Sequence, residues 1–236
     1  MLDVEDLHAF YGPSHVVQGV SFSITKGEAV ALVGRNGVGK TSTLKSLIGL
    51  ETRTRGTVKL EGTPLMGMAS HVRASRGLGY VPEERAVFPQ MTVEENIRIG
   101  ALRHRGKDQR GVLDRAYSLF PILRERRQQM AGTLSGGQQK MLGLARGIAL
   151  QPKLLMVDEP TEGLMPANVE LITNALLTAI REGMTVLVVD SSFDLLRQLC
   201  SRMYAMDRGL LIGTYRPGDF SSPDELAATM LGEARH

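Results

Sequence analysis

Residues 34–41 follow the phosphate-binding pattern G-x-x-x-x-G-K-[ST] at every fixed position, as Gly34-Arg35-Asn36-Gly37-Val38-Gly39-Lys40-Thr41. The apolar run at 29–33 predicts a buried strand ahead of this loop, and the apolar spacing over 41–49 predicts a helix behind it. Free backbone N–H groups and the positive end of a helix dipole would then face a triphosphate. Lys40 would neutralise its β- and γ-phosphates, and the Thr41 hydroxyl would bind Mg²⁺. A glycine turn that happens to carry a lysine is the alternative. The flanking strand and helix favour a nucleoside-triphosphate site.

Two adjacent carboxylates, Asp158 and Glu159, follow the apolar run 154–157 and precede Pro160. Such a run predicts a central parallel strand, so both carboxylates would lie at its carboxyl end, where ligands bind in open α/β sheets. Asp158 could hold Mg²⁺ through water. Glu159 could orient or deprotonate the water that attacks a phosphate.

A second glycine motif, Leu134-Ser135-Gly136-Gly137-Gln138-Gln139, lies between the phosphate loop and the carboxylates. Ser135 precedes a helical pattern, so helix capping alone would explain a serine here. Capping and a role in ligand binding are compatible, and the motif leaves both open.

The order of these three motifs closely resembles that of the ATP-binding cassette (ABC) ATPases, and the resemblance covers about residues 2–228. It implies an α/β fold with a P-loop NTPase (RecA-like) core, an antiparallel β subdomain and an inserted helical subdomain. The core and β subdomain would take residues 1–83 and 151–236, and the helical subdomain about 84–150, within one ABC ATPase domain over 1–236. ATP and Mg²⁺ would bind in a head-to-tail dimer, between the phosphate loop of one subunit and the signature Ser135-Gly136-Gly137-Gln138 of the other.

The resemblance also assigns roles to single residues. Tyr11, just after the first predicted strand, would stack on adenine, although an aromatic residue there could also be ordinary core. Glu159 and Ser191 would be catalytic, and Thr41, Glu83 and Asp158 would bind the metal. The residues expected to contact ATP are Tyr11, Gly34, Arg35, Asn36, Gly37, Val38, Gly39, Lys40, Thr41 and Ser42.

Residues 80–96 and 158–166 are similar to one ABC subgroup, the ATPase subunits of importers for branched-chain amino acids and for urea and short amides. This similarity implies a second ABC ATPase subunit, two transmembrane permease subunits and a periplasmic or extracellular solute-binding protein as partners. The chain would lie on the cytoplasmic side of the cell membrane as a peripheral subunit. By position, Val87, Phe88 and Pro89 are candidates for an exposed apolar groove that receives the permease, or else for core.

Three residues depart from the general family pattern. Glu83 replaces a glutamine, and must either bind Mg²⁺ or point away, because a carboxylate repels phosphates. Met165 replaces an aspartate that bridges the dimer. Ser191 replaces a histidine that contacts the γ-phosphate, which predicts slow hydrolysis. Alternatively, Ser191 or Ser192 simply caps the helix expected from residue 193, with Asp194 completing a capping box for Ser191.

Composition agrees with this interpretation. The chain has 236 residues, 42% hydrophobic and 22% charged, which suffices for one substantial α/β core. We expect no membrane span or signal peptide, and Cys200, the single cysteine, excludes an intrachain disulfide. Basic clusters at 103–110 and 124–127 lack interleaved aromatic residues, so nucleic-acid binding is not expected.

Rival functions remain. A DNA-repair ATPase would need a long insertion between the phosphate loop and the signature, for which the spacing leaves no room. A weakly hydrolysing regulatory half-site of a heterodimeric transporter and an exporter ATPase stay open as alternatives. An exporter would usually keep the glutamine and histidine that are missing here.

Turn residues and capping patterns along the rest of the chain predict the elements that position these motifs. Residues 2–33 and 56–61 should form short strands broken at 12–13, 26–27 and 61–62. Thr92 to Glu95 is a capping box that opens a helix, 110–120 continues the helical block, and Pro121 interrupts it. Further helices are expected over 166–181 and 193–200, and one capped at 222–225. Strands are expected at 185–189, 203–206 and 210–215, with a turn at 207–209.

Overall fold

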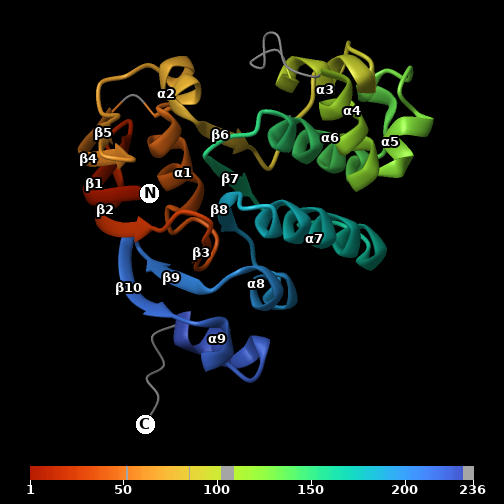
Figure 1. The fold of residues 1–236 in the computed structure, drawn as a ribbon. Coiled ribbons are helices and arrows are strands. Elements are labelled where there is room, and N and C mark those ends of the chain that lie inside the picture. Colours follow the sequence, from red (N-terminus) through yellow and green to blue (C-terminus); the bar gives the residue numbers. More distant parts are fainter. Residues whose placement is uncertain (52, 85, 102–108, 231–236) are drawn as a thin grey trace.

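The computed structural model describes residues 1–51, 53–84, 86–101 and 109–230, and it contains two β-sheets with helices around them (Figure 1). The strands are β1 (Leu2–Tyr11), β2 (Ser14–Ile24), β3 (Ala29–Val33), β4 (Arg53–Leu60), β5 (Thr63–Pro64), β6 (Leu78–Val81), β7 (Leu154–Asp158), β8 (Thr185–Val189), β9 (Arg202–Asp207) and β10 (Leu210–Tyr215). The helices are α1 (Lys40–Ile48), α2 (Ser70–Arg76), α3 (Val93–Ala101), α4 (Gln109–Leu119), α5 (Pro121–Glu125), α6 (Gly136–Ala149), α7 (Pro166–Arg181), α8 (Phe193–Leu199) and α9 (Pro223–Met230), with 3₁₀ helices η1 (Ala131–Thr133) and η2 (Pro217–Asp219).

The larger sheet has the order β10-β9-β3-β8-β7-β6, with all neighbours parallel except β10, which is antiparallel to β9. Strands β3, β7 and β8 are buried along their whole length, which explains their continuous apolar runs. Alternate residues face two separate cores. Val30 and Leu32 of β3 face a core that includes α1, whereas Ala31 and Val33 face one that includes α7 and α8. The predicted P-loop core is therefore confirmed.

The smaller sheet is antiparallel, with the order β2-β1-β4-β5. Its breaks at 12–13 and 61–62 fall where the sequence predicts them, and the predicted break at 26–27 separates β2 from β3 of the larger sheet. Helix α1 contacts β1 and β2 of this sheet and β6 and β7 of the larger one, so it lies between the two sheets (Figure 1). The antiparallel sheet thus covers the same core as the helix that begins at the phosphate loop.

Helices α3 to α6 lie between β6 and β7 in the chain and form a separate lobe beside the sheets (Figure 1). Thr92 and Glu95 form the predicted capping box, with Glu95 N donating to Thr92 Oγ1 at 3.2 Å and Thr92 N to Glu95 Oε2 at 2.8 Å. Pro121 ends α4 and begins α5. The division of the chain into subdomains at 84 and 150 stays a prediction.

The C-terminal elements follow the predicted order, with two corrections at helix caps. The cap of α8 is Ser192, whose Oγ accepts from Leu195 N at 3.4 Å, so the box between Ser191 and Asp194 is wrong. At α9, Ser222 Oγ accepts from Glu225 N as expected, but the Glu225 carboxylate accepts from Ser221 N rather than from Ser222 N. In both cases two serines are adjacent, so the sequence did not decide which of them makes each capping hydrogen bond.

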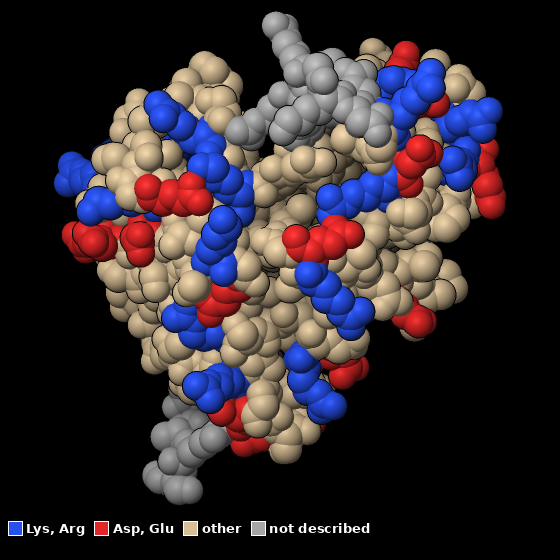
Figure 2. Space-filling view, in the orientation of Figure 1, with Lys and Arg blue, Asp and Glu red and all other residues tan. Residues whose placement is uncertain are grey.

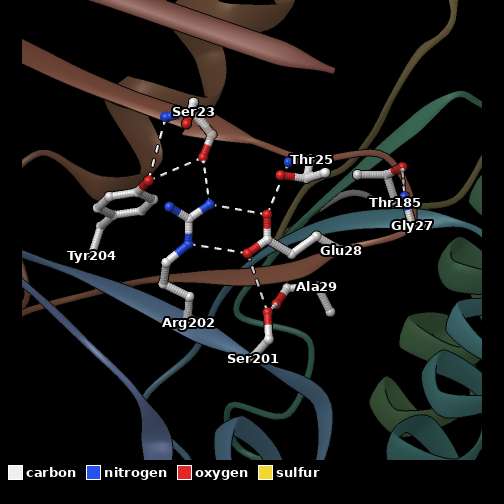
Figure 3. Close-up of polar contacts among 9 residues, drawn as sticks. All are labelled: Ser23, Thr25, Gly27, Glu28, Ala29, Thr185, Ser201, Arg202 and Tyr204. Carbon is white, nitrogen blue, oxygen red and sulfur yellow. Dashed lines mark hydrogen bonds and ion pairs between the residues drawn. The ribbon is translucent and has the colours of Figure 1, made fainter.

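An ion pair holds β9 against the start of β3. Arg202 donates two bonds to Glu28, from Nε at 3.0 Å and from Nη2 at 2.9 Å (Figure 3). Thr25 N also donates to Glu28, and Tyr204 donates to Ser23 O at 3.0 Å. This network fixes the amino end of β3, five residues ahead of the phosphate loop.

Charged residues of both signs are interspersed on the face shown in Figure 2. Within the predicted cluster 124–127, Arg124 pairs with Asp114 at 3.0 Å, while residues 103–108 of the other basic cluster lie outside the described residues. Cys200 is buried, and burial raises its thiol pKa to about 12. In the part of the chain that the structure describes, no helix has the length and apolarity needed to cross a membrane.

Candidate active site

The phosphate loop joins the end of β3 to the first residue of α1, as predicted. Gly39 caps α1 with a left-handed φ of 110°. Gly34 packs so closely on β9 that an added Cβ would lie 2.3 Å from the Met206 carbonyl oxygen. Val38 is buried, and its carbonyl accepts from Gly209 N at 2.9 Å. The loop is therefore held against β9 and the turn that follows it, and Gly34 and Gly39 permit the close approach and the left-handed conformation that this requires.

A cleft of about 390 Å³ opens over this loop. Its lining combines the loop, the start of α1, one residue of β2 and three carboxylates: Val16, Asn36, Gly37, Gly39, Lys40, Thr41, Ser42, Glu83, Glu159 and Glu162. The structure thus brings together residues that lie far apart in the sequence.

Lys40 is almost fully buried and donates from Nζ to two carbonyl oxygens of its own loop, Gly34 at 2.9 Å and Arg35 at 3.0 Å. Its Nζ also lies 3.7 Å from Glu159 Oε1. A buried ammonium needs such partners, and phosphate oxygens could take their place. Lys40 is therefore positioned to neutralise a bound triphosphate.

Asp158 and Thr41, two of the residues expected to bind the metal, contact each other. Thr41 Oγ1 donates to Asp158 Oδ1 at 3.1 Å, and Tyr80 Oη donates to Asp158 Oδ2 at 3.0 Å. Asp158 is 1% exposed, and this burial raises its pKa against the effect of the two hydrogen bonds.

The described residues contain no group of three or more His, Cys, Asp or Glu side chains arranged to hold a metal. Mg²⁺ typically takes one or two carboxylates together with phosphate oxygens and water. The Thr41 and Asp158 oxygens fit that requirement. Thr41 and Glu83 line the cleft, and Asp158 contacts Thr41.

Glu159 follows β7 in a left-handed conformation, with φ 45°. Its N–H donates to Val189 O at 2.7 Å, which continues the pairing of β7 with β8. Burial raises the pKa of its carboxyl to about 7, while Lys40 opposes the shift. A carboxyl of this kind can exchange a proton with water near neutral pH.

Glu83 lies in the cleft, and therefore does not point away from it. Burial raises the pKa of Glu83, and a hydrogen bond with Glu162 and the charge of Asp158 raise it further. The Lys140 ammonium opposes this shift. A metal ion or a shared proton would relieve the repulsion between these carboxylates.

A profile described as ABC transporter matches residues 17–162. The high-affinity branched-chain amino acid transport ATP-binding protein BraG of Pseudomonas aeruginosa is 36% identical over 212 residues, which cover 90% of this chain and 91% of BraG. The chain belongs to the ABC transporter family.

Two further relatives of this ABC protein extend over nearly its full length. The lipopolysaccharide export system ATP-binding protein LptB of Haemophilus influenzae is 30% identical and covers 99% of this chain and 98% of LptB. A solved ATP binding subunit of an ABC transporter is 26% identical, with a TM-score of 0.85 over 98% of this chain and 99% of its own. The fold and the family are thereby established.

The signature of this ABC ATPase lies outside the cleft lining, at the amino end of α6. Ser135 and Gln138 form a complete capping box, so the capping interpretation is correct. Ser135 and Gly136 are exposed. Tyr11 ends β1 and is 74% exposed, so it is not a core residue.

Ser191 lies beside the phosphate cleft rather than in its lining. It borders a second cavity of about 370 Å³, together with Gly34 and Arg35 of the loop and Leu226 of α9. The side chain of Ser191 is exposed.

The segment that follows β6 is only partly exposed. Val87 belongs to the core, so its assignment to an exposed groove is wrong, whereas Phe88 is 45% exposed. The Arg146 guanidinium lies 4.7 Å from the centre of the Phe88 ring. Buried Asn96 accepts from Phe88 N at 2.8 Å and donates to Phe88 O at 3.0 Å.

The sequence did not single out three residues that support the site. Tyr80 contacts Asp158, and Lys140 of α6 donates from Nζ to Glu159 O and Glu162 O, each at 2.8 Å. Buried Asp190 accepts from Thr161 N and Oγ1. Tyr80 begins the segment 80–96 that is similar to the importer subgroup, and Asp190 follows the strand expected at 185–189, but their partners depend on how distant segments pack.

Proposed function

We propose that this chain is the ATP-binding and ATP-hydrolysing subunit that powers an ABC importer for branched-chain amino acids or a related small amide or amino acid. The identity to BraG over nine-tenths of both chains carries the proposal. The Val-Pro-Glu sequence that ends at Glu83 and the sequence after Glu159 support the same subgroup.

The proposed site needs two chains. ATP would lie between residues 34–41 of one subunit and Ser135–Gln138 of the other, with Tyr11 stacked on adenine. The exposure of Ser135 and Gly136 at a helix N-terminus supports this arrangement, because the positive end of the helix dipole there is accessible to phosphate oxygens of a second subunit.

A complementation test addresses the two-chain site. A dimer of Lys40→Ala with Ser135→Arg would contain one site with both defects and one intact site. If the chain pairs with itself, mixing the two inactive variants is expected to restore ATP turnover. An active wild type together with a silent mixture would contradict the two-chain site.

The residues of the cleft account for hydrolysis. Lys40 and the loop N–H groups would hold the β- and γ-phosphates, while Thr41 and Asp158 would hold Mg²⁺, with Glu83 as a further ligand. The metal would neutralise charge that develops on the transferred phosphoryl group. Glu159 would orient the attacking water and accept its proton, which the raised pKa of this carboxyl favours.

We also propose that hydrolysis at this phosphate loop is slow because Ser191 lacks an imidazole. A hydrogen bond to a charged group is worth about 1.5–3 kcal/mol, or roughly ten- to a hundredfold in rate if it acts only in the transition state. The position of Ser191 beside the cleft is compatible with this reduced role. Replacement of Ser191 by histidine should raise single-site turnover in the assembled complex, and no gain would contradict the proposal.

The proposed assembly places the chain on the cytoplasmic side of the membrane as a peripheral subunit, with a second ABC ATPase subunit, permease subunits and a solute-binding protein. Phe88, exposed and stacked on Arg146, is the proposed permease contact. Phe88→Asp should uncouple transport while ATP affinity is retained. Loss of both would show that the residue is structural.

An uptake experiment distinguishes import from export, for which the identity to LptB is the supporting observation. Deletion of the gene in its host should lower uptake of labelled leucine, isoleucine and valine, and the wild-type gene, but not Lys40→Ala, should restore it. Unchanged uptake together with a defective outer membrane would favour the exporter.

A further inference from the structure

The carboxylate of Asp158 is held by two hydroxyl groups from different elements. Thr41 at the start of α1 donates to Oδ1 at 3.1 Å, and Tyr80 of β6 donates to Oδ2 at 3.0 Å. Because Asp158 is 1% exposed, these donors satisfy oxygens that water hardly reaches. Thr41 is a proposed metal ligand, whereas Tyr80 has so far no role.

The position of the Tyr80 hydroxyl is set by packing that does not depend on the hydroxyl. Strand β6 pairs in parallel with β7, with Tyr80 opposite Met156, two residues before Asp158. The half-buried ring packs against the core that includes Leu44 and Leu47 of α1. Replacement of Tyr80 by phenylalanine would therefore keep these contacts and remove one donor.

We infer that Tyr80 is a positioning residue for the metal site: its hydroxyl fixes the Asp158 carboxylate so that Oδ1 faces Thr41 and the Mg²⁺ that accompanies ATP. This inference rests on the proposed binding of ATP and Mg²⁺ in the cleft. If the Thr41 oxygen binds the metal through a lone pair, its O–H can still donate to Asp158 Oδ1. Tyr80 is the second donor and holds the other carboxylate oxygen, Oδ2. Such outer partners orient ligating carboxylates, and their loss typically lowers metal affinity by about 10- to 100-fold.

The test compares Tyr80→Phe with the wild type in the full chain. Mn²⁺, a paramagnetic substitute for Mg²⁺, is titrated in the presence of a non-hydrolysable ATP analogue, and free Mn²⁺ is measured by electron paramagnetic resonance. We expect Mn²⁺ to bind roughly tenfold more weakly to the variant, with unchanged affinity for the analogue in the absence of metal. Turnover of the variant should approach that of the wild type at high Mg²⁺.

Tyr204→Phe is the matched control. Tyr204 is also a strand tyrosine whose hydroxyl donates to an oxygen, but its acceptor is Ser23 O at 3.0 Å and not Asp158 (Figure 3). This control should leave Mn²⁺ affinity unchanged. Equal Mn²⁺ affinity in Tyr80→Phe and the wild type would overturn the inference, as would an equal loss in both tyrosine variants. Failure of the wild type to bind the analogue would instead overturn the proposed function.

Discussion

Replacement of Glu159 by glutamine should stabilise the ATP-free chain, and the gain should grow with pH. The carboxyl is 7% exposed, and its pKa is raised from 4.5 to about 7 because burial disfavours the ion. Between these values the folded chain binds more protons than the unfolded chain. The unfolding free energy of the wild type therefore falls as pH rises through this window. Glutamine cannot ionise, so the unfolding free energy of the variant does not fall in this way as pH rises.

The structure also sets the size of the effect. At about 1.4 kcal/mol per tenfold in proton affinity, the difference between 4.5 and about 7 is worth about 3 kcal/mol when fully developed. Between pH 5 and pH 8 the stability advantage of Glu159→Gln over the wild type should thus grow by about 2–3 kcal/mol. The comparison of two variants at each pH cancels the titration of the other carboxyls.

Urea unfolding of the nucleotide-free chain at several pH values between 5 and 8 measures this difference. Glu170→Gln, an exposed position on α7, is the matched control and should show a difference that does not vary with pH. A stability difference between Glu159→Gln and the wild type that is constant over this range would refute the reasoning. It would show that the Glu159 carboxylate pays no desolvation penalty in the folded chain.

Three other substitutions test the contacts around the site. Lys140→Met should lower the unfolding free energy by about 2 kcal/mol, because it removes two charge-assisted hydrogen bonds to carbonyl oxygens. The control Lys153→Met removes an exposed ion pair and should lower the unfolding free energy by less. Equal losses of stability in urea unfolding would count against the Lys140 contact. Gly34→Ala should weaken ATP binding in calorimetry by tenfold or more, since its Cβ would meet a backbone oxygen at 2.3 Å, whereas Gly218→Ala, with open space around it, should bind normally. Burial alone would raise the pKa of Glu28, but its hydrogen bonds lower it, so its stabilisation is present above the unfolded value of 4.5 and is lost as pH falls through the folded pKa (Figure 3). Glu28→Gln should accordingly destabilise the chain at pH 7 and much less at acid pH, and a pH-independent effect in unfolding experiments would speak against this.

The sequence was sufficient where one local pattern carried the information. The loop 34–41, the strand that ends at Asp158 and the cap at Ser135 each follow from neighbouring residues, because capping, burial and glycine geometry act over a few positions. Most strands of the two sheets followed from strand spacing and from turn residues, whereas the edge strands β5 and β6 were not predicted. These elements position the phosphate-binding part of the cleft, but not all of the carboxylates that line it.

Contacts between distant segments could not be predicted in this way. Lys140 contacts the Glu159 carbonyl because α6 packs beside the end of β7, and the sequence of neither segment indicates this contact. Val87 is buried in the same core as residues of α6. The adjacent Ala86 packs so closely on this helix that a Cβ added to Gly143 would lie 2.5 Å from the Ala86 Cβ. Adjacent serines likewise left the cap of α8 uncertain by one residue, which the packing of Phe193 resolves.

ATP hydrolysis by the purified chain and by Glu159→Gln, with ATP affinity measured for both, tests the central claim most directly. We expect Mg²⁺-dependent turnover by the wild type that falls at least about a hundredfold in the variant, with ATP affinity retained. Turnover by Glu159→Gln at a rate comparable to the wild type would contradict the assignment of Glu159 as the group that activates water.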